Sequence, residues 1–290
     1  MKLMLKFNIA LLVVFILGLI ITGVVSYGVL QANAHEEILD NARVMMETAL
    51  SSRSYTDAQI KPLLETQLRY SFLPQSVFAY AATEQFNDLR KKYPDYSYKE
   101  ATLNPTNPRD RATDWEAEIV NRFRNGQAKG DLVGERETPN GKSLYLARAI
   151  QITDGACLAC HNTVAEAPKT MVELYGPANG FGWKLNEIIG AQIVSVPSAL
   201  PLQRASHTFK IFMLLLALVL IVTFILINVM LHSIVIQRVK ALAKSADDVS
   251  LGQVETADFR DRSKDEIGTL SQALGRMNKS LVQAIKMLET

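Results

Sequence analysis

Two long apolar runs stand out from the mixed polar and apolar pattern of the chain. Residues 7–27 and residues 211–231 contain no charged side chain. A helix of roughly 20 residues crosses the hydrocarbon core of a bilayer. A buried helix of a soluble protein is rarely apolar on every face for that length. The pattern therefore predicts two transmembrane helices, residues 7–28 and 209–232, in a lipid bilayer.

Basic residues flank these runs on the outer sides. Lys2 and Lys6 precede the first run, and Arg238, Lys240 and Lys244 follow the second. Because basic flanks stay in the cytoplasm, both chain ends are expected there. The chain then divides into a cytoplasmic segment 1–6, an exported domain 29–208 and a cytoplasmic domain 233–290. This orientation predicts a two-pass protein of the bacterial inner (cytoplasmic) membrane with a periplasmic domain.

A cleavable signal peptide is the alternative for the first run, with Ala32-Asn33-Ala34 as its cleavage site. Signal peptides usually carry about 7–15 apolar residues. The run here is longer, which favours an uncleaved signal anchor. Both alternatives place the following residues outside the cytoplasm.

The exported domain opens with helical patterns. Apolar residues recur at helical spacing directly after the first run, which extends that helix outward: Ile38, Ala42, Met45, Met46 and Ala49. Two further helices are predicted over residues 59–72 and 75–92. Prolines and asparagines between residues 93 and 116 argue against long regular structure there. A helix restarts near Thr113, which has capping-box spacing to Glu116.

Strand patterns follow these helices. Residues 131–137 and 143–152 read as two strands joined at Asn140-Gly141, a hairpin sequence. Residues 190–197 read as a last buried strand. Helices followed by hairpin strands predict an α+β fold with an antiparallel sheet.

Both cysteines of the chain and one of its four histidines lie in "CLACH", residues 157–161. In a C-x-x-C-H motif, Cys157 and Cys160 would form thioethers to a haem and His161 would be an axial iron ligand. A Cys157–Cys160 disulfide would leave His161 unexplained. A thioredoxin-like pair would need a βαβ setting, and zinc would need about four ligands. The sequence therefore predicts covalent haem c, with iron, outside the cytoplasm.

The sixth iron ligand stays open at this point. Both cysteines are used, so the candidates are His35, Met171 and Tyr80. A vacant sixth position is the other alternative, and it would suit gas binding.

Four stretches carry a resemblance to a known family. "LNPTNPRDRATDWE", "CLACH", "YGPANGFGW" and "GAQIVSVP" occur in that order. Together they resemble the PAS-like c-type haem sensor domain of bacterial membrane receptors, over residues 35–205. The resemblance implies a PAS-like fold and a sensing role. Some relatives offer a sulfur ligand from an upstream helix, where this chain has no cysteine.

Four residues are candidates to line the haem pocket: Tyr98, Asn104, Asn107 and Arg109. Arg109 would lie near a propionate. The alternative is that the asparagines and prolines only build a turn and that the arginine is solvated.

The cytoplasmic tail carries an apolar seam in two segments. The first segment holds Val239, Leu242, Ala246 and Val249. The second holds Ile267, Leu270, Leu274, Met277, Leu281, Ala284 and Leu288. Steps of three and four residues are typical of coiled coils.

Two heptad helices after a membrane helix, with "DEIG" at residues 265–268, resemble a HAMP domain. Val239 follows Arg238 where that family often has proline. One chain alone cannot bury such seams, so the pattern predicts a homodimer through the HAMP segment.

The net charge of +2 does not favour nucleic acid as a partner. No phosphate-binding or nucleophile motif is recognised, so the chain is not expected to be an enzyme. The expected function is a haem-based receptor that senses redox state or a small gas and signals to a separate cytoplasmic effector or kinase. The alternative is a membrane-anchored c-type cytochrome for electron transfer. A haem peroxidase would need a distal acid-base group, which the sequence does not identify.

Overall fold

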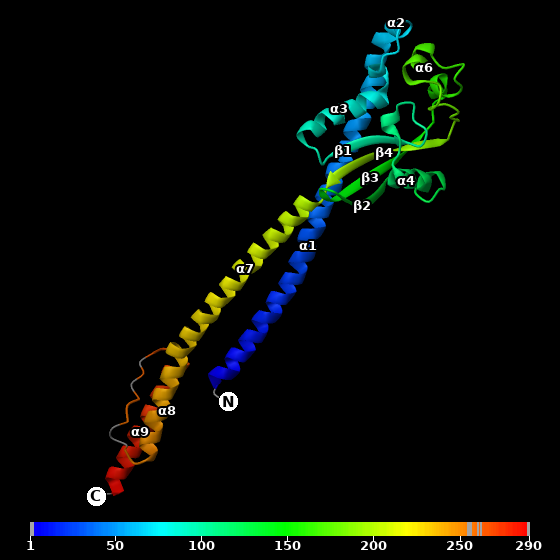
Figure 1. Cartoon of the computed structure of the whole chain (residues 1–290). Coiled ribbons are helices and arrows are strands. Elements are labelled where there is room, and N and C mark those ends of the chain that lie inside the picture. The colour runs from blue at the N-terminus through cyan, green and yellow to red at the C-terminus, as the bar shows by residue number, and fades with distance from the viewer. Residues whose placement is uncertain (1–2, 254–256, 260, 262, 289–290) are drawn as a thin grey trace. The chain divides into compact units, whose positions relative to one another are not determined.

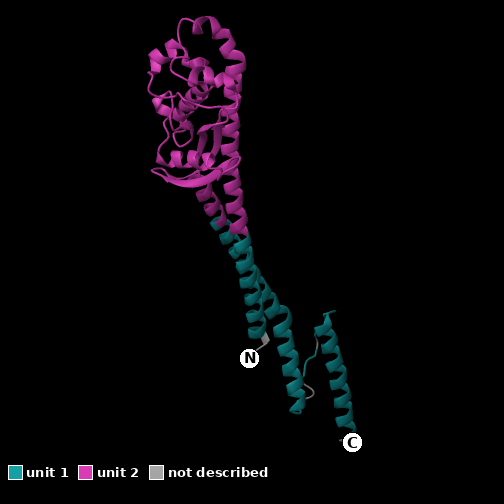
Figure 2. Cartoon of the chain, turned by 90° about the vertical axis from the view of Figure 1, so that its right-hand side faces the viewer, with its two compact units in different colours: residues 1–25, 210–290 teal, residues 26–209 magenta. Residues whose placement is uncertain are grey.

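The computed structural model describes residues 3–253, 257–259, 261 and 263–288. Lys2 and the side chain of Leu288 lie outside what is described. The chain forms two compact units, residues 26–209 and residues 1–25 with 210–290 (Figure 2). Each is described by itself below.

A four-stranded antiparallel sheet forms the centre of the unit 26–209 (Figure 1). Its strands are β1 (Ser97–Thr102), β2 (Leu132–Thr138), β3 (Gly141–Gln151) and β4 (Ile188–Pro197), in the order β1-β4-β3-β2. The β2–β3 hairpin and the buried β4 confirm the strand predictions. β4 is buried at nearly every residue because it is a central strand covered on both faces.

The strand β1 corrects the expectation that residues 93–116 lack regular structure. Tyr98 pairs with Val194, and Ala101 with Ala191, in an unbroken register along β4. The prolines at 105 and 108 fall after the strand, in the loop and the short 3-10 turn η4 (Pro108–Asp110). The prolines at 94, 105 and 108 therefore all lie outside the strand, where a missing N–H costs no ladder bond.

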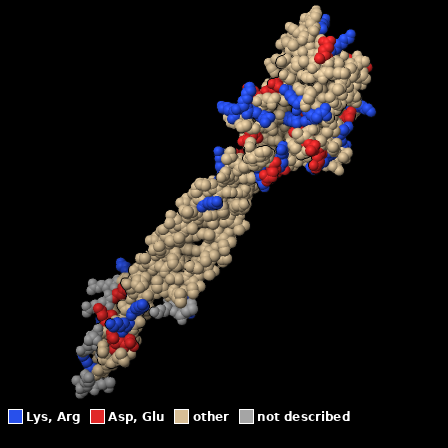
Figure 3. Space-filling model, viewed as in Figure 1, with Lys and Arg blue, Asp and Glu red and all other residues tan. Residues whose placement is uncertain are grey.

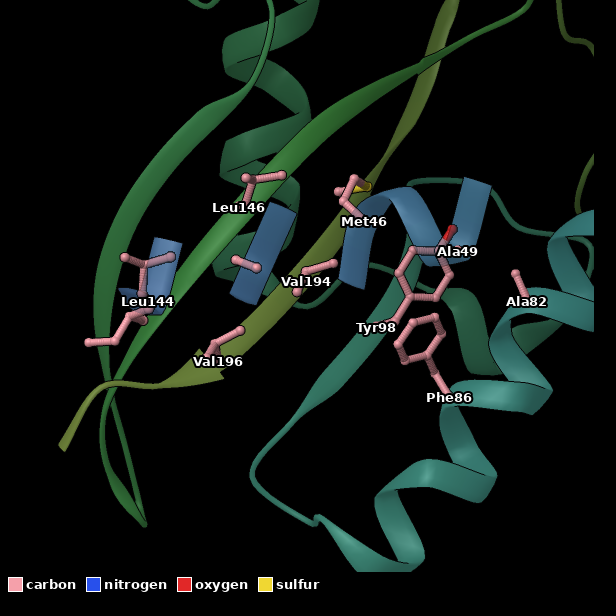
Figure 4. Close-up of a cluster of buried hydrophobic side chains, with 11 residues drawn as sticks. Met46, Ala49, Ala82, Phe86, Tyr98, Leu144, Leu146, Val194 and Val196 are labelled. Atoms are coloured by element: carbon pink, nitrogen blue, oxygen red, sulfur yellow. The ribbon is translucent and has the colours of Figure 1, made fainter. Parts of the chain in front are cut away.

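One face of the sheet is covered by α1 (Leu3–Tyr55) and α3 (Phe78–Lys92). Their buried side chains meet alternate residues of three strands, as expected when successive strand residues point to opposite faces. Figure 4 shows this cluster. It contains Ile38, Ala42, Met46, Ala49, Ala82, Phe86, Tyr98, Leu144, Leu146, Val194 and Val196.

The other face is covered by α4 (Asp114–Arg124), whose Ile119, Val120 and Phe123 pack on Ala147 and Ile193. The capping box predicted for this helix is present, because the side chains of Thr113 and Glu116 reciprocally satisfy backbone groups. The sheet is thus a middle layer, with α1 and α3 on one face and α4 on the other. This confirms a mixed helix and sheet fold.

The prediction of one continuous helix over residues 59–72 is wrong. After α1, the chain makes a π turn η1 (Thr56–Ile60), a 3-10 turn η2 (Lys61–Leu64) and one short helix α2 (Glu65–Leu68). Pro62 has no N–H group for a helical hydrogen bond, so a continuous α-helix cannot run through it. Pro74 likewise lies in the 3-10 turn η3 (Pro74–Ser76), before α3 begins.

The other unit contains the apolar parts of α1 and of α7 (Ala199–Met230). By length and composition alone, both helices could cross a membrane, and none of their most apolar window is buried. On the face shown in Figure 3, charged side chains are nearly absent from these helices.

A π-helical segment η6 (Leu231–Ile236) joins α7 to α8 (Gln237–Ser250), and α9 (Glu266–Leu288) follows a connector. Arg238 holds the described part of the connector. Its guanidinium makes bidentate contacts of 2.6 and 2.9 Å with Asp265 and a 2.7 Å contact with Asp261. Asp265 also caps α9 through the N–H of Gly268, where a side chain would collide with the carbonyl of Ser263. The predicted two-helix tail is therefore present, with "DEIG" at its second helix start.

Candidate functional site

The C-x-x-C-H motif folds into consecutive tight turns. Cys157 ends the 3-10 turn η5 (Gly155–Cys157), and Cys160 and His161 belong to the following turn α5 (Leu158–His161). The Asp154 carboxylate starts the motif by accepting from the N–H of Ala156 at 2.8 Å. Residues three apart on a helical turn lie on the same side, so both thiols share a side. Both are half-buried and free, and no disulfide joins them.

The His161 imidazole is held in one orientation. Its Nδ1 lies 2.7 Å from the carbonyl oxygen of Gly180, and its ring stacks on Trp183 with centroids 3.8 Å and planes 15° apart. A carbonyl can only accept, so Nδ1 carries the hydrogen and Nε2 keeps a lone pair. Burial lowers the pKa of His161, which favours the neutral ring that a metal needs.

The loop that carries Gly180 is tied back to the motif. The N–H groups of Gly182 and Trp183 donate to the carbonyls of Asn162 and His161, at 2.7 and 3.2 Å. These bonds use two carbonyls that the short turn α5 leaves open. These two hydrogen bonds therefore hold the loop in a fixed position against the motif.

Asn104 ties a third segment to the same loop. Its Oδ1 accepts from the N–H of Gly180 at 3.3 Å, and its Nδ2 donates to the carbonyl of Phe181 at 3.4 Å. Gly180 has a φ of +85°, and a Cβ there would lie 2.8 Å from the Cα of Thr106. Only glycine fits this conformation and this approach. The "NPTNP" loop, "CLACH" and "ANGFGW" thus converge on His161.

Both thiols are held in the protonated form by their surroundings. Burial raises the pKa of both Cys157 and Cys160, while Lys61 acts in the opposite direction on each and Arg53 on Cys157. The thiols are therefore held in the protonated form, unlike the acidic thiols of redox pairs. Among residues 3–253 and the described tail, no cluster of three or more His, Cys, Asp and Glu side chains offers zinc a ligand set.

The other predicted pocket residues have different partners. The Tyr98 ring packs in the sheet core, and its hydroxyl donates to Glu100 at 2.8 Å and accepts from Gln192 at 3.1 Å. Asn107 accepts from the N–H of Arg109 at 3.2 Å, which builds the turn that the alternative expected. Of the four, the structure brings Asn104 to the loop beside His161.

Arg109 is engaged away from His161. Its guanidinium pairs with Glu84 and lies 4.5 Å from the Tyr80 ring centroid. Asp110 lies 3.6 Å from the same guanidinium. The alternative expected a solvated arginine, but the Arg109 side chain is paired, and its contact with Glu84 joins η4 to α3.

The candidates for a sixth ligand lie in different places. His35 Nδ1 is 3.6 Å from Glu135 on β2. His35 is therefore placed against β2. Met171 is buried on α6 (Lys169–Tyr175), and Tyr80 lies under Arg109.

Several residues at the site were missed by sequence reasoning: Thr106, Gly180, Phe181 and Trp183. The glycine-rich stretch "YGPANGFGW" was expected only to form a loop. Three of its glycines have positive φ values, at 176, 180 and 182. Such a run of glycines beside a tryptophan is the feature that could have marked the loop as a close partner of the motif.

The fold and this site define a mixed α and β domain with a C-x-x-C-H turn, which lies between two apolar helices in the order of the chain. A family model described as Tll0287-like matches residues 31–197. Because this is more than half of the chain, the chain belongs to the Tll0287-like family.

Among solved structures, the chain is similar to the cyanobacterial heme-protein Tll0287. The two are 18% identical over 56% of this chain and 95% of that chain, with a TM-score of 0.43. No curated protein matches this chain.

Proposed function

We propose that this chain is a membrane-bound haem receptor whose periplasmic domain carries covalent haem c. Cys157 and Cys160 would form the thioethers, and His161 would bind the iron through Nε2. The observation that carries this proposal is the fixed imidazole: its Nδ1–H group is bonded to a carbonyl, which is how proteins orient ligating histidines. The description of Tll0287, after which the family is named, as a cyanobacterial heme-protein agrees with it.

The residues present fit this group. The two free thiols lie on one side of a helical turn, next to a neutral histidine with a free ring nitrogen. A bound haem would supply an iron centre that changes redox state or takes a small gas. The chain's own residues hold the imidazole through the Gly180 carbonyl and stack Trp183 on its ring.

Signalling is favoured over simple electron carriage by the way the site connects to the apolar helices. Met46 and Ala49 of α1 pack in one core with Tyr98 of β1, the strand that precedes Asn104, and α1 is unbroken from Leu3 to Tyr55. β4 leads into α7 with only Ser198 between them. A change at the site that favours one packing would shift the population of states in these helices.

The tail would receive this change as a HAMP relay and pass it to a separate cytoplasmic effector or kinase. The two helices α8 and α9, held by Arg238, support this assignment. A membrane-anchored c-type cytochrome is the competing function, and it uses the same haem site. The PAS-like fold and the inner-membrane location are part of the proposal.

Covalent attachment is tested by a haem stain on a denaturing gel of the full chain. We expect staining of the native chain and its loss in the double variant Cys157→Ser, Cys160→Ser, because neither thioether can form without its thiol. Met171→Leu is the control and should still stain. An unstained native chain, or an intact mass showing a Cys157–Cys160 disulfide, would contradict the proposal.

Carbon monoxide then separates sensing from carriage. We expect the spectrum of the reduced protein to change with carbon monoxide if the iron has an open or displaceable position. An unchanged low-spin spectrum together with fast reduction by a soluble cytochrome would favour the electron carrier.

A further inference from the structure

Asn104 is the side chain that fixes the backbone on both sides of the Gly180 carbonyl. Its amide accepts from the N–H of Gly180 and donates to the carbonyl of Phe181, the next residue. The Gly180 carbonyl between them accepts from His161 Nδ1. An asparagine amide can make both bonds at once because it has a donor and an acceptor group.

We infer that Asn104 is a positioning residue that sets the strength of the His161–Gly180 hydrogen bond and, through it, the electron donation of the iron ligand. This inference rests on the proposed haem function. A shorter, better aligned Nδ1–H bond raises the basicity of the opposite ring nitrogen. More electron donation from that nitrogen stabilises the oxidised iron and lowers its reduction potential.

Backbone bonds of Gly182 and Trp183 also tie this loop to the motif, and Asn104 is the side chain bonded at the Gly180–Phe181 peptide. Gly180 has a left-handed backbone, so its orientation depends on its neighbours rather than on regular secondary structure. Thr106 Oγ1 lies 3.4 Å from His161 Nδ1, which is longer than the 2.7 Å to Gly180. The Gly180 carbonyl is therefore the main acceptor, and Asn104 is the side chain that holds it.

The hydrogen bonds that join His161, Gly180 and Asn104 also connect the iron ligand to the sheet. Asn104 follows β1 by two residues, and the N–H of Leu103 donates to the carbonyl of Ile189, before Gly190 on β4. A movement of the imidazole would therefore pull on the end of β1 through Gly180 and Asn104. This places the positioning residue between the iron ligand and the strand that leads into α7.

The test compares Asn104→Ala with Asn107→Ala in the full chain. Asn107 lies on the same loop, and its side chain accepts from the N–H of Arg109 in its own turn, so it is the matched control. We expect Asn104→Ala to raise the midpoint potential by about 59 mV, which is a tenfold change in the one-electron reduction equilibrium. Asn107→Ala should leave the potential unchanged. Equal shifts, or no shift in Asn104→Ala, would overturn the inference.

A second readout does not need haem. With only four histidines in the chain, ¹⁵N-histidine labelling of the haem-free Cys157→Ser, Cys160→Ser protein gives few signals. We expect His161 to show a single tautomer protonated at Nδ1, and Asn104→Ala to mix the two tautomers. An unchanged His161 signal in Asn104→Ala would refute the positioning role, whether or not haem attaches in the native chain.

Misfolding is separated from positioning by Asn104→Asp. The carboxylate keeps the acceptor for Gly180 but loses the donor to Phe181, so an intermediate potential and tautomer mixture are expected. Normal signals from His35, His207 and His232 show that the variant is folded. A folded Asn104→Asp chain with native values in both readouts would count against the inference.

Discussion

At the scale of the residue, Asp110 shows how burial competes with charge. Its carboxylate lies beside the Arg109 guanidinium, which favours ionisation, yet burial dominates and raises the pKa to about 6. Glu100 and Glu84 raise the pKa further, while Lys99 lowers it. Neither the sequence nor the Arg109–Asp110 spacing predicts this, because the solvent exposure of the carboxyl decides it.

This pKa predicts a pH dependence of stability. The folded chain binds the Asp110 proton more tightly than the unfolded chain, so the contribution to the free energy of unfolding is fully present below about pH 4. It is lost as the pH rises through about 6, by at most about 3 kcal/mol. Thermal unfolding at pH 4–7 should therefore show native stability falling relative to Asp110→Asn. Parallel curves for the two proteins would contradict the raised pKa.

At the scale of the element, a local capping sequence decided where a helix starts, and proline decided where a helix is interrupted. The capping box at Thr113 fixes the start of α4 with two reciprocal bonds. In contrast, apolar spacing over residues 59–72 predicted a helix that Pro62 breaks into η1, η2 and α2. A local rule therefore holds when its hydrogen bonds are available and fails when one donor is missing.

The cap of α4 can be measured directly. We expect Thr113→Ala to lower the free energy of unfolding by about 1 kcal/mol, because the N-terminal helix donors lose a side-chain acceptor. Thr48→Ala is the control, since exposed Thr48 lies inside α1 and bonds to the carbonyl of Val44. Its removal should cost little or nothing. Equal losses in the two variants, by denaturant unfolding, would show that the cap does not stabilise α4.

At the scale of the whole molecule, the tail leaves apolar surface uncovered in the single chain. Leu270, Met277 and Leu281 on α9 are 48%, 57% and 42% exposed, and Val239 on α8 is 40% exposed. Leu242 is buried, so the chain covers part of its own seam. Exposed residues at heptad spacing support the proposed homodimer.

Dimerisation is tested with a charge in this seam. Leu281→Lys should weaken association by about tenfold or more, because each chain loses the burial of one leucine. Gln272→Lys adds the same charge to the same helix outside the seam and is the control. Mass photometry of the full chain in detergent reports the ratio of dimer to monomer. A native monomer, or equal weakening by both variants, would contradict the dimer.

The sequence by itself determined the features that depend on neighbours along the chain. These are the two apolar helices, the β2–β3 hairpin, the cap at Thr113 and the C-x-x-C-H turn. Each depends on spacing or on hydrogen bonds within a few residues, which a linear pattern records.

The tertiary structure decided what depends on residues far apart. β1 exists because Tyr98 and Ala101 meet β4, and the orientation of His161 depends on Gly180, Trp183 and Asn104 from two other loops. Such contacts are decided by how the layers pack, because packing brings together residues whose separation along the chain carries no local signal.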